Sequence, residues 1–283
     1  MPLTPTADIV ADAAEAGVGI GSFNVIQVEH AEGIVAGAEA ARAPVILQIS
    51  ENCVRYHGGL GAIGAAALAV ARSATAPVAV HLDHATSPRL VDEALALGFG
   101  SVMFDASTLD YSENVNATAE VAAACHRAGA WVEAELGEVG GKDGVHAPGA
   151  RTDPAEATAY VEATGIDALA VAVGTSHQML TRDAVLDFDL IAALRAAVAV
   201  PLVLHGSSGV SDADLERAIE HGMTKINIAT HLNKAFTRAV REHLTANADE
   251  VDTRTYLGAG RDAVAAEVTR LLRVMGSAGA AVT

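Results

Sequence analysis

Two kinds of hydrophobic pattern follow one another along this chain, and the pair repeats eight times. Short apolar runs rich in Val and Ile are separated by longer, Ala-rich stretches in which apolar residues recur at helical spacing. This alternation is typical of βα units wound around a parallel sheet. The apolar runs predict eight strands, at residues 19–24, 45–49, 78–82, 101–104, 131–135, 168–173, 201–205 and 224–228. We therefore expect an α/β fold, a TIM (β/α)8 barrel that forms a single domain over residues 1–283.

Helices are expected between most of these strands because typical capping residues frame the intervening segments. Segments 87–98, 153–165 and 211–222 each begin with Ser or Asp, which can cap the first helical turn, and each ends in Gly. Residues 258–275 predict one further helix after the eighth unit.

Three predicted connections are too long to be plain turns. They cover residues 50–60, 136–153 and 174–188, and long loops at one end of a barrel usually carry function. The segment LGEVGGKDGVHAPGARTDP is rich in Gly and charge, so we interpret it as a mobile flap over a site.

Composition narrows the class of protein further. The chain has 283 residues, 51% of them hydrophobic, and a formal net charge of -17, which disfavours binding to nucleic acid or to an anionic membrane. Two cysteines, Cys53 and Cys125, are too few for a disulfide framework, and the acidic N-terminus lacks the basic start of a signal peptide. The longest apolar runs are too short to span a bilayer, so we expect a cytoplasmic protein.

Histidines recur where predicted strands end, which is where barrels of this kind place their active sites. His84 follows the third strand, His177 follows the sixth, and His205 ends the seventh. Taken singly, each could be an ordinary polar residue in a loop. Together they match a catalytic zinc ion that keeps one coordination position open for substrate or water.

Asp83 lies beside His84 in the motif HLDHATS and should face the same site. It could exchange a proton with a substrate bound to the metal, or it could be a helix cap or orient a zinc ligand. His81 should share a strand face with Asp83, and we expect it to be buried and structural.

Two segments rich in small residues follow the seventh and eighth strands. HGSSGVSDADL and NIATHLNKAF each place backbone N–H groups and hydroxyls ahead of a helix, where a phosphate can bind. Barrels of this class often bind phosphate after these two strands. Either segment alone could equally be an ordinary capped turn.

The sequence resembles the class II ketose-bisphosphate aldolases, the family of fructose-bisphosphate and tagatose-bisphosphate aldolases. The resemblance covers nearly the whole chain and includes the motifs GSFNV, HLDHATS, VEAELGEVGG, AVGTSH, PLVLHGSSG and DTRTYLGAGRDAV, in the order of the family. It implies zinc-dependent cleavage of a ketose phosphate to dihydroxyacetone phosphate and an aldehyde such as glyceraldehyde 3-phosphate. A monovalent cation, Na⁺ or K⁺, and a homodimer or homotetramer are also implied.

By position, the resemblance implies zinc ligands at His84, His177 and His205, with Glu135 near the metal, and a proton shuttle at Asp83. Phosphate binding is implied for the turns after the last two strands, and recognition of the far end of the ketose for Asn24, Ser50, Asp252 and Arg254. The predicted substrate-binding residues are Asn24, Ser50, Gln178, Gly206, Ser207, Ser208, Asn227, Ile228, Ala229, Thr230, Asp252 and Arg254.

The chain departs from the family pattern near the substrate. The flap reads GGKDGV and lacks one acidic residue, so Asp143 is the natural proton donor, with Glu138 a poorer one. Gln178 stands where the family has Gly, and Ala229 is closer to the tagatose-bisphosphate branch.

Three alternatives remain open at this point. A Schiff-base aldolase would need a nucleophilic lysine, but Lys142 lies on the flap, Lys234 in a helix, and Lys225 at a strand start that we expect far from the site. A metal-dependent hydrolase would use the same kind of histidines to activate water. A zinc-binding and phosphosugar-binding paralogue without activity would fit the altered flap.

Overall fold

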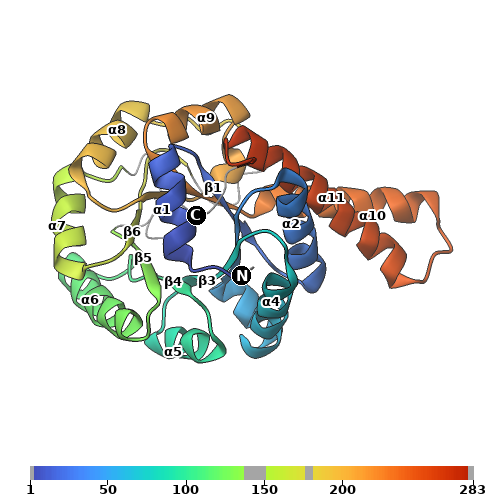
Figure 1. Ribbon diagram of the computed structural model, residues 1–283, viewed down its shortest axis with the longest axis horizontal. Coiled ribbons are helices and arrows are strands. Elements are labelled where there is room, and N and C mark those ends of the chain that lie inside the picture. Colours follow the sequence, from blue (N-terminus) through green and yellow to red (C-terminus); the bar gives the residue numbers. More distant parts are fainter. Residues whose placement is uncertain (1–2, 137–150, 176–180, 280–283) are drawn as a thin grey trace.

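The strands form a closed eight-stranded parallel barrel in sequence order, which confirms the predicted TIM (β/α)8 fold (Figure 1). The structure is a computed structural model, and it describes residues 3–136, 151–175 and 181–279. The strands are β1 (Ile20–Asn24), β2 (Val45–Ser50), β3 (Val78–Ala85), β4 (Ser101–Phe104), β5 (Trp131–Glu135), β6 (Ala168–Ala170), β7 (Leu202–Leu204) and β8 (Met223–Ile228).

A ring of helices surrounds this barrel (Figure 1). The helices are α1 (Thr6–Ala16), α2 (Val28–Ala41), α3 (Glu51–His57), α4 (Gly61–Ser73), α5 (Pro88–Leu97), α6 (Tyr111–Arg127), α7 (Pro154–Thr164), α8 (Phe188–Ala197), the 3₁₀ turn η1 (Ser207–Gly209), α9 (Asp212–Glu220), α10 (Thr230–Ala246) and α11 (Thr253–Val274). Asp153 and Ser211 cap α7 and α9 as expected, since their side chains accept bonds from backbone N–H groups of the first turn.

Four sequence predictions need correction. The stretch 50–60 is not a plain loop, because it contains α3, which Ser50 caps. Strand β3 continues past residue 82 to Ala85, whereas β6 ends at Ala170 instead of residue 173. The last helix starts earlier than residue 258, at Thr253.

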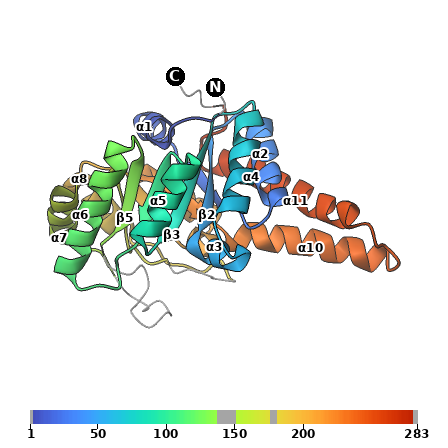
Figure 2. The same ribbon diagram turned by 90° about the horizontal axis from the view of Figure 1, so that it is seen from below.

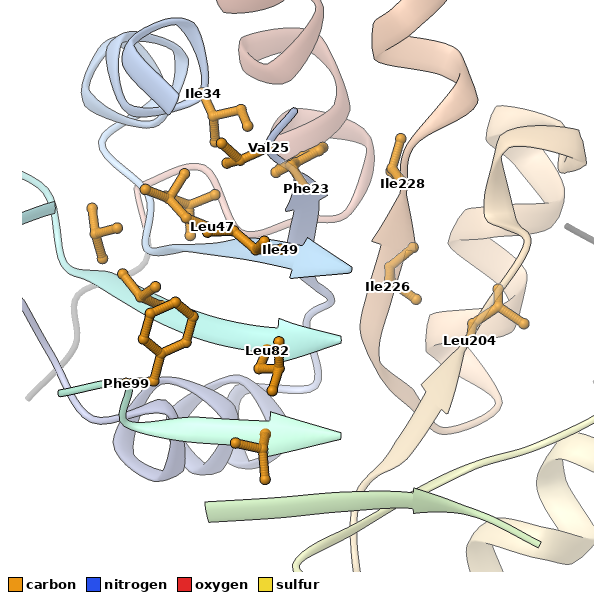
Figure 3. Close-up of a cluster of buried hydrophobic side chains, with 14 of the residues drawn as sticks. Phe23, Val25, Ile34, Leu47, Ile49, Leu82, Phe99, Leu204, Ile226 and Ile228 are labelled. Carbon is orange, nitrogen blue, oxygen red and sulfur yellow. The ribbon is translucent and has the colours of Figure 1, made fainter. Parts of the chain in front are cut away.

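Two apolar clusters fill the two sides of the barrel wall. The outward side chains of the strands pack against the surrounding helices, as Figure 3 shows for Phe23, Leu47, Ile49 and Leu82. The inward cluster occupies the amino-terminal end of the barrel, which we call the bottom. Its members are Ile9, Val10, Ala13, Ile20, Ile46, Ala79, Met103, Trp131, Ala168, Ala170 and Val203. Because three of them belong to α1, that helix closes the bottom (Figure 1).

Helices α10 and α11 form a hairpin that projects from the barrel (Figures 1 and 2). The base of the hairpin packs closely on α2, where Gly33 and Gly37 face α11. A Cβ added at Gly33 would lie 2.7 Å from the carbonyl oxygen of Arg261, and one at Gly37 would lie 2.6 Å from that of Ala265. Small residues therefore allow the two backbones to approach. Within the described ranges, no helix has the length and apolarity needed to cross a membrane.

Candidate active site and metal centre

The end of β3 brings two consecutive side chains to one centre. Neighbouring residues of a regular strand point to opposite faces, but the register with β4 shifts between Leu82 and Ala85, and His84 has a left-handed backbone with φ 52°. As a result, ligand atoms of Asp83, His84 and His205 all lie within 4.8 Å of one another. A left-handed non-glycine residue costs about 1–3 kcal/mol, and such residues cluster at functional sites.

The two imidazoles face each other with the geometry of metal ligands. His84 Nε2 lies 3.1 Å from His205 Nδ1. Two nitrogens bound tetrahedrally to one zinc ion, each at about 2.0–2.1 Å, would be about 3.3 Å apart. The opposite ring nitrogens are already engaged, since His84 Nδ1 donates to Asp105 at 2.7 Å and His205 Nε2 donates to Glu133 at 2.9 Å. These carboxylates orient both rings, so that His84 Nε2 and His205 Nδ1 point towards the same centre.

The electrostatics of this centre favour a cation. Burial by itself lowers the pKa of His84, but Asp83, and then Asp105 and Glu135, raise that pKa to about 10. The pKa of His205 is lowered by burial, against the opposing hydrogen bond to Glu133. Among the described residues, Asp83 Oδ1 is buried without a hydrogen-bond partner. An excess of carboxylates around nitrogen donors fits a divalent metal, which supplies the missing positive charge.

Glu135 belongs to a second, overlapping group of ligand atoms. One carboxylate oxygen of Glu135, one ring nitrogen of His84 and one carboxylate oxygen of Asp105 all lie within 4.8 Å of one another, and the Glu135 side chain is buried. The prediction that Glu135 lies near a metal bound by His84 is therefore geometrically possible.

A charged layer lies directly beneath the two histidines. Glu133 and Lys225 are fully buried and form an ion pair of 2.8 Å. Lys225 also donates to Asn227 at 2.8 Å, and the Asn227 amide nitrogen lies 3.1 Å from His205 Nε2. The expectation that Lys225 lies far from the site was wrong. Lys225 contacts both Glu133 and Asn227, and each of these two side chains contacts His205. His81 is buried as predicted, with its Nδ1 2.9 Å from Ser101 Oγ.

The two predicted phosphate turns lie side by side. Gly206 adopts a left-handed backbone with φ 67°, and η1 follows it. Ser208 Oγ accepts a bond of 3.1 Å from the backbone N–H of His231, in the first turn of α10, whereas Ser207 Oγ donates to Leu204 O at 3.0 Å. Asn227 and Ile228 end strand β8, and Ala229 and Thr230 lead into the helix.

Asn24 and Ser50 end the neighbouring strands β1 and β2. Asn24 Oδ1 accepts a bond of 2.6 Å from Gln48, which also accepts a bond from Ser22. Ser50 Oγ caps α3 by accepting from the Cys53 N–H at 3.3 Å. Both predicted residues thus lie at the carboxyl end of the barrel, the end that we call the mouth.

Asp252 and Arg254 are not brought to this mouth. They lie where α11 begins, next to the tip of the projecting hairpin, and they pair with each other at 2.6 Å (Figure 2). Four further predicted residues lie outside the described residues, namely Glu138, Asp143, His177 and Gln178.

Sequence reasoning missed three residues that orient the site. Asp105 follows β4, so the same rule of strand ends could have found it. Glu133 stands two positions before Glu135 and shares its strand face, which was a usable signal. Gln48 carried no such signal, because one polar residue in an apolar strand does not reveal its partners.

Together, the barrel and this site define a metal-dependent (β/α)8 enzyme, and comparisons with known proteins identify its family. Residues 4–280 match the model of the family Fructose-bisphosphate aldolase class-II. The chain is 41% identical to the "Probable fructose-bisphosphate aldolase" of Bacillus subtilis, across 98% of this chain and 99% of that protein. It is 39% identical to the "Fructose-bisphosphate aldolase" of Geobacillus stearothermophilus, across 99% of each.

A solved structure agrees with the sequence relatives. The crystal structure of the YdjI aldolase from Escherichia coli K12 superimposes with a TM-score of 0.85 at 35% identity, covering 98% of each chain. This protein belongs to the class II fructose-bisphosphate aldolase family. It is therefore a carbon–carbon lyase that performs metal-dependent aldol cleavage to dihydroxyacetone phosphate and glyceraldehyde 3-phosphate. The Schiff-base and hydrolase alternatives are wrong.

Proposed function

We propose that the metal is Zn²⁺, bound by His84, His205 and His177, with Glu135 able to approach it. The observation that carries this proposal is the 3.1 Å separation of His84 Nε2 and His205 Nδ1. The buried, unpartnered Oδ1 of Asp83 beside them supports it. The assignment of His177 rests on the sequence, because that residue lies outside the described ranges.

In this proposal, Asp83 is the proton shuttle. The zinc ion, when bound, supplies a Lewis acid that stabilises the negative charge developing on the ketose carbonyl as the C3–C4 bond breaks. Asp83 takes the proton of the C4 hydroxyl during cleavage and returns it during condensation. A second acid then protonates C3 of the dihydroxyacetone phosphate half. We assign this role to Asp143, with Glu138 as the poorer candidate.

The phosphate of the dihydroxyacetone half is proposed to bind where the two turns meet. The hydrogen bond between Ser208 and the start of α10 supports this, because it aligns the η1 turn with a helix N-terminus. The proposed contacts are Gly206, Ser207, Ser208, Asn227, Ile228, Ala229 and Thr230. A monovalent cation, Na⁺ or K⁺, near these turns stays a prediction, as does the cytoplasmic location.

Fructose 1,6-bisphosphate is the proposed substrate, because the sequence relatives named above are fructose-bisphosphate aldolases. Asn24, Ser50 and Gln178 would contact the sugar at the mouth. Ala229 favours tagatose 1,6-bisphosphate as a second candidate. Asp252 and Arg254 lie next to the hairpin tip, so we propose that they reach substrate only in a neighbouring protomer of a homodimer or homotetramer.

A coupled cleavage assay tests these assignments. It should compare fructose 1,6-bisphosphate, tagatose 1,6-bisphosphate and ketose 1-phosphates on protein whose zinc content has been measured. We expect the highest kcat/KM for fructose 1,6-bisphosphate. A higher kcat/KM for tagatose 1,6-bisphosphate or for a ketose 1-phosphate would overturn the assignment of fructose 1,6-bisphosphate.

A further inference from the structure

Lys225 is a fully buried lysine inside the barrel. Its Nζ lies 2.8 Å from Glu133 Oε2 and donates to Asn227 Oδ1 at 2.8 Å. Taking an ammonium group and a carboxylate out of water is costly, and well-packed apolar residues would often serve stability equally well. The presence of this ion pair therefore calls for a reason other than stability.

The other oxygen of the same carboxylate points at a proposed zinc ligand. Glu133 Oε1 accepts from His205 Nε2 at 2.9 Å, and both side chains are fully buried. With its proton on Nε2, His205 presents the lone pair of Nδ1 towards His84. Lys225 is thus two contacts away from the nitrogen that would bind the metal.

Another buried group competes for Glu133. His81 Nε2 lies 3.9 Å from Glu133 Oε2 and is buried without a hydrogen-bond partner among the described residues. Without the ammonium group of Lys225, Glu133 could turn towards His81 and leave His205 Nε2. His205 could then adopt the other tautomer, whose protonated Nδ1 cannot bind a metal.

We propose that Lys225 is a positioning residue for zinc binding, which holds Glu133 against His205 so that the His205 ring proton stays on Nε2 and Nδ1 can bind the metal. This inference rests on the proposed zinc site. Groups that orient metal ligands in this way typically change metal affinity by about 10–100-fold when they are altered.

Zinc affinity, measured by competition with a chromogenic chelator, gives a test that is independent of turnover. We expect Lys225→Met to raise the Kd for zinc by about 10–100-fold. The matched control is Lys234→Met, which removes a lysine from the exposed surface of α10 and should leave the Kd unchanged. Unchanged affinity in folded Lys225→Met would overturn the inference.

A double-mutant cycle with Glu133→Gln shows whether Lys225 acts through Glu133. We expect Glu133→Gln to weaken zinc binding as well, and Lys225→Met to add less than about threefold in that background. If the increase in Kd of the double variant equals the product of the increases in the two single variants, the two residues act independently, which would contradict the inference.

A folding failure of Lys225→Met is also covered by this cycle. The single variant leaves a buried carboxylate unpaired, whereas Lys225→Met/Glu133→Gln removes both charges and keeps an acceptor for His205. If only the double variant folds, its Kd should equal that of Glu133→Gln within about threefold. A larger difference would contradict the inference.

Nitrogen chemical shifts of ¹⁵N-labelled histidine supply a second readout on metal-free protein. Wild type should show His205 protonated at Nε2, and Lys225→Met should show a mixture of tautomers. Wild-type protein that binds no zinc would overturn the proposed metal site. Tight zinc binding by both wild type and Lys225→Met would overturn only the role of Lys225.

Discussion

The bottom and the mouth of the barrel use the same strands for opposite purposes. Along β5, the inward residues change from Trp131 in the apolar cluster to Glu133 and Glu135 beneath and beside the candidate metal centre. Along β3 they change from Ala79 to His81 and then Asp83. The first layer excludes water and stabilises the fold, whereas the last layers hold charge where a substrate can arrive.

This difference teaches that stability and chemistry are separated by position along each strand. The apolar end is closed by α1 and needs no specific partners beyond good packing. At the charged end, buried groups such as Lys225, Glu133 and His205 are paired with side chains from other strands. Changes at the two ends should therefore have separable effects on unfolding and on metal-dependent turnover.

Metal removal should have the largest effect and should act only on the mouth. Chelation is expected to lower the rate of aldol cleavage by about 10³-fold or more, since the Lewis acid supplies several kcal/mol in the transition state. Added zinc should restore the rate of wild type but not that of His205→Ala, which loses a ligand. Full activity in protein shown to be metal-free by elemental analysis would contradict the view that the mouth works through a bound metal.

Asp83→Ala should come next. Turnover is expected to fall by about 10²–10⁴-fold because the general base is gone, while zinc content stays at the level of wild type. The coupled cleavage assay and elemental analysis on the same sample measure both quantities. Loss of zinc together with activity would instead make Asp83 a metal ligand.

Ile46→Ala probes the bottom. This fully buried side chain belongs to the inward apolar cluster, so its truncation should lower the free energy of unfolding by about 2–5 kcal/mol. Zinc affinity and kcat/KM at 25 °C should stay close to wild type. Urea unfolding of zinc-saturated protein measures the first quantity, and a large fall in zinc affinity would show that the two ends are coupled.

Asp105→Asn is expected to act more weakly on the mouth. The variant keeps the shape of the side chain but removes the charge that holds His84 Nδ1 at 2.7 Å. The Kd for zinc should rise by about 10–100-fold without a comparable loss of stability. An unchanged Kd would mean that the bulge of β3 alone orients His84.

The smallest expected effect is on the pH dependence of stability, and it comes from His30, a buried histidine of α2 outside the barrel. It stacks on Phe236 at 5.0 Å, both of its ring nitrogens lack hydrogen-bond partners among the described residues, and burial lowers its pKa to about 4. As the pH falls, His30 becomes protonated near pH 6.5 in the unfolded chain but only near pH 4 in the folded protein. The free energy of unfolding of wild type should therefore decrease between these two pH values. His30→Leu should lose less over that window, and thermal unfolding at pH 8 and pH 5 tests the difference.

Local patterns were enough to predict the barrel and much of its site. Short apolar runs rich in Val and Ile, together with capped helices, define eight βα units, and the strand-end rule pointed to Asp83, His84 and His205. These features depend on residues that are close in sequence. The family motifs then supplied the reaction.

Tertiary structure decided the rest, because it depends on which strands become neighbours. Only the pairing of β3 with β4 produces the bulge that turns Asp83 and His84 to one centre. Only the closed barrel brings Lys225 to Glu133, a contact between residues far apart in sequence that no local pattern encodes. The site therefore takes its residue types from the sequence, whereas its charge pairs come from barrel closure, since buried charges must find partners across the fold.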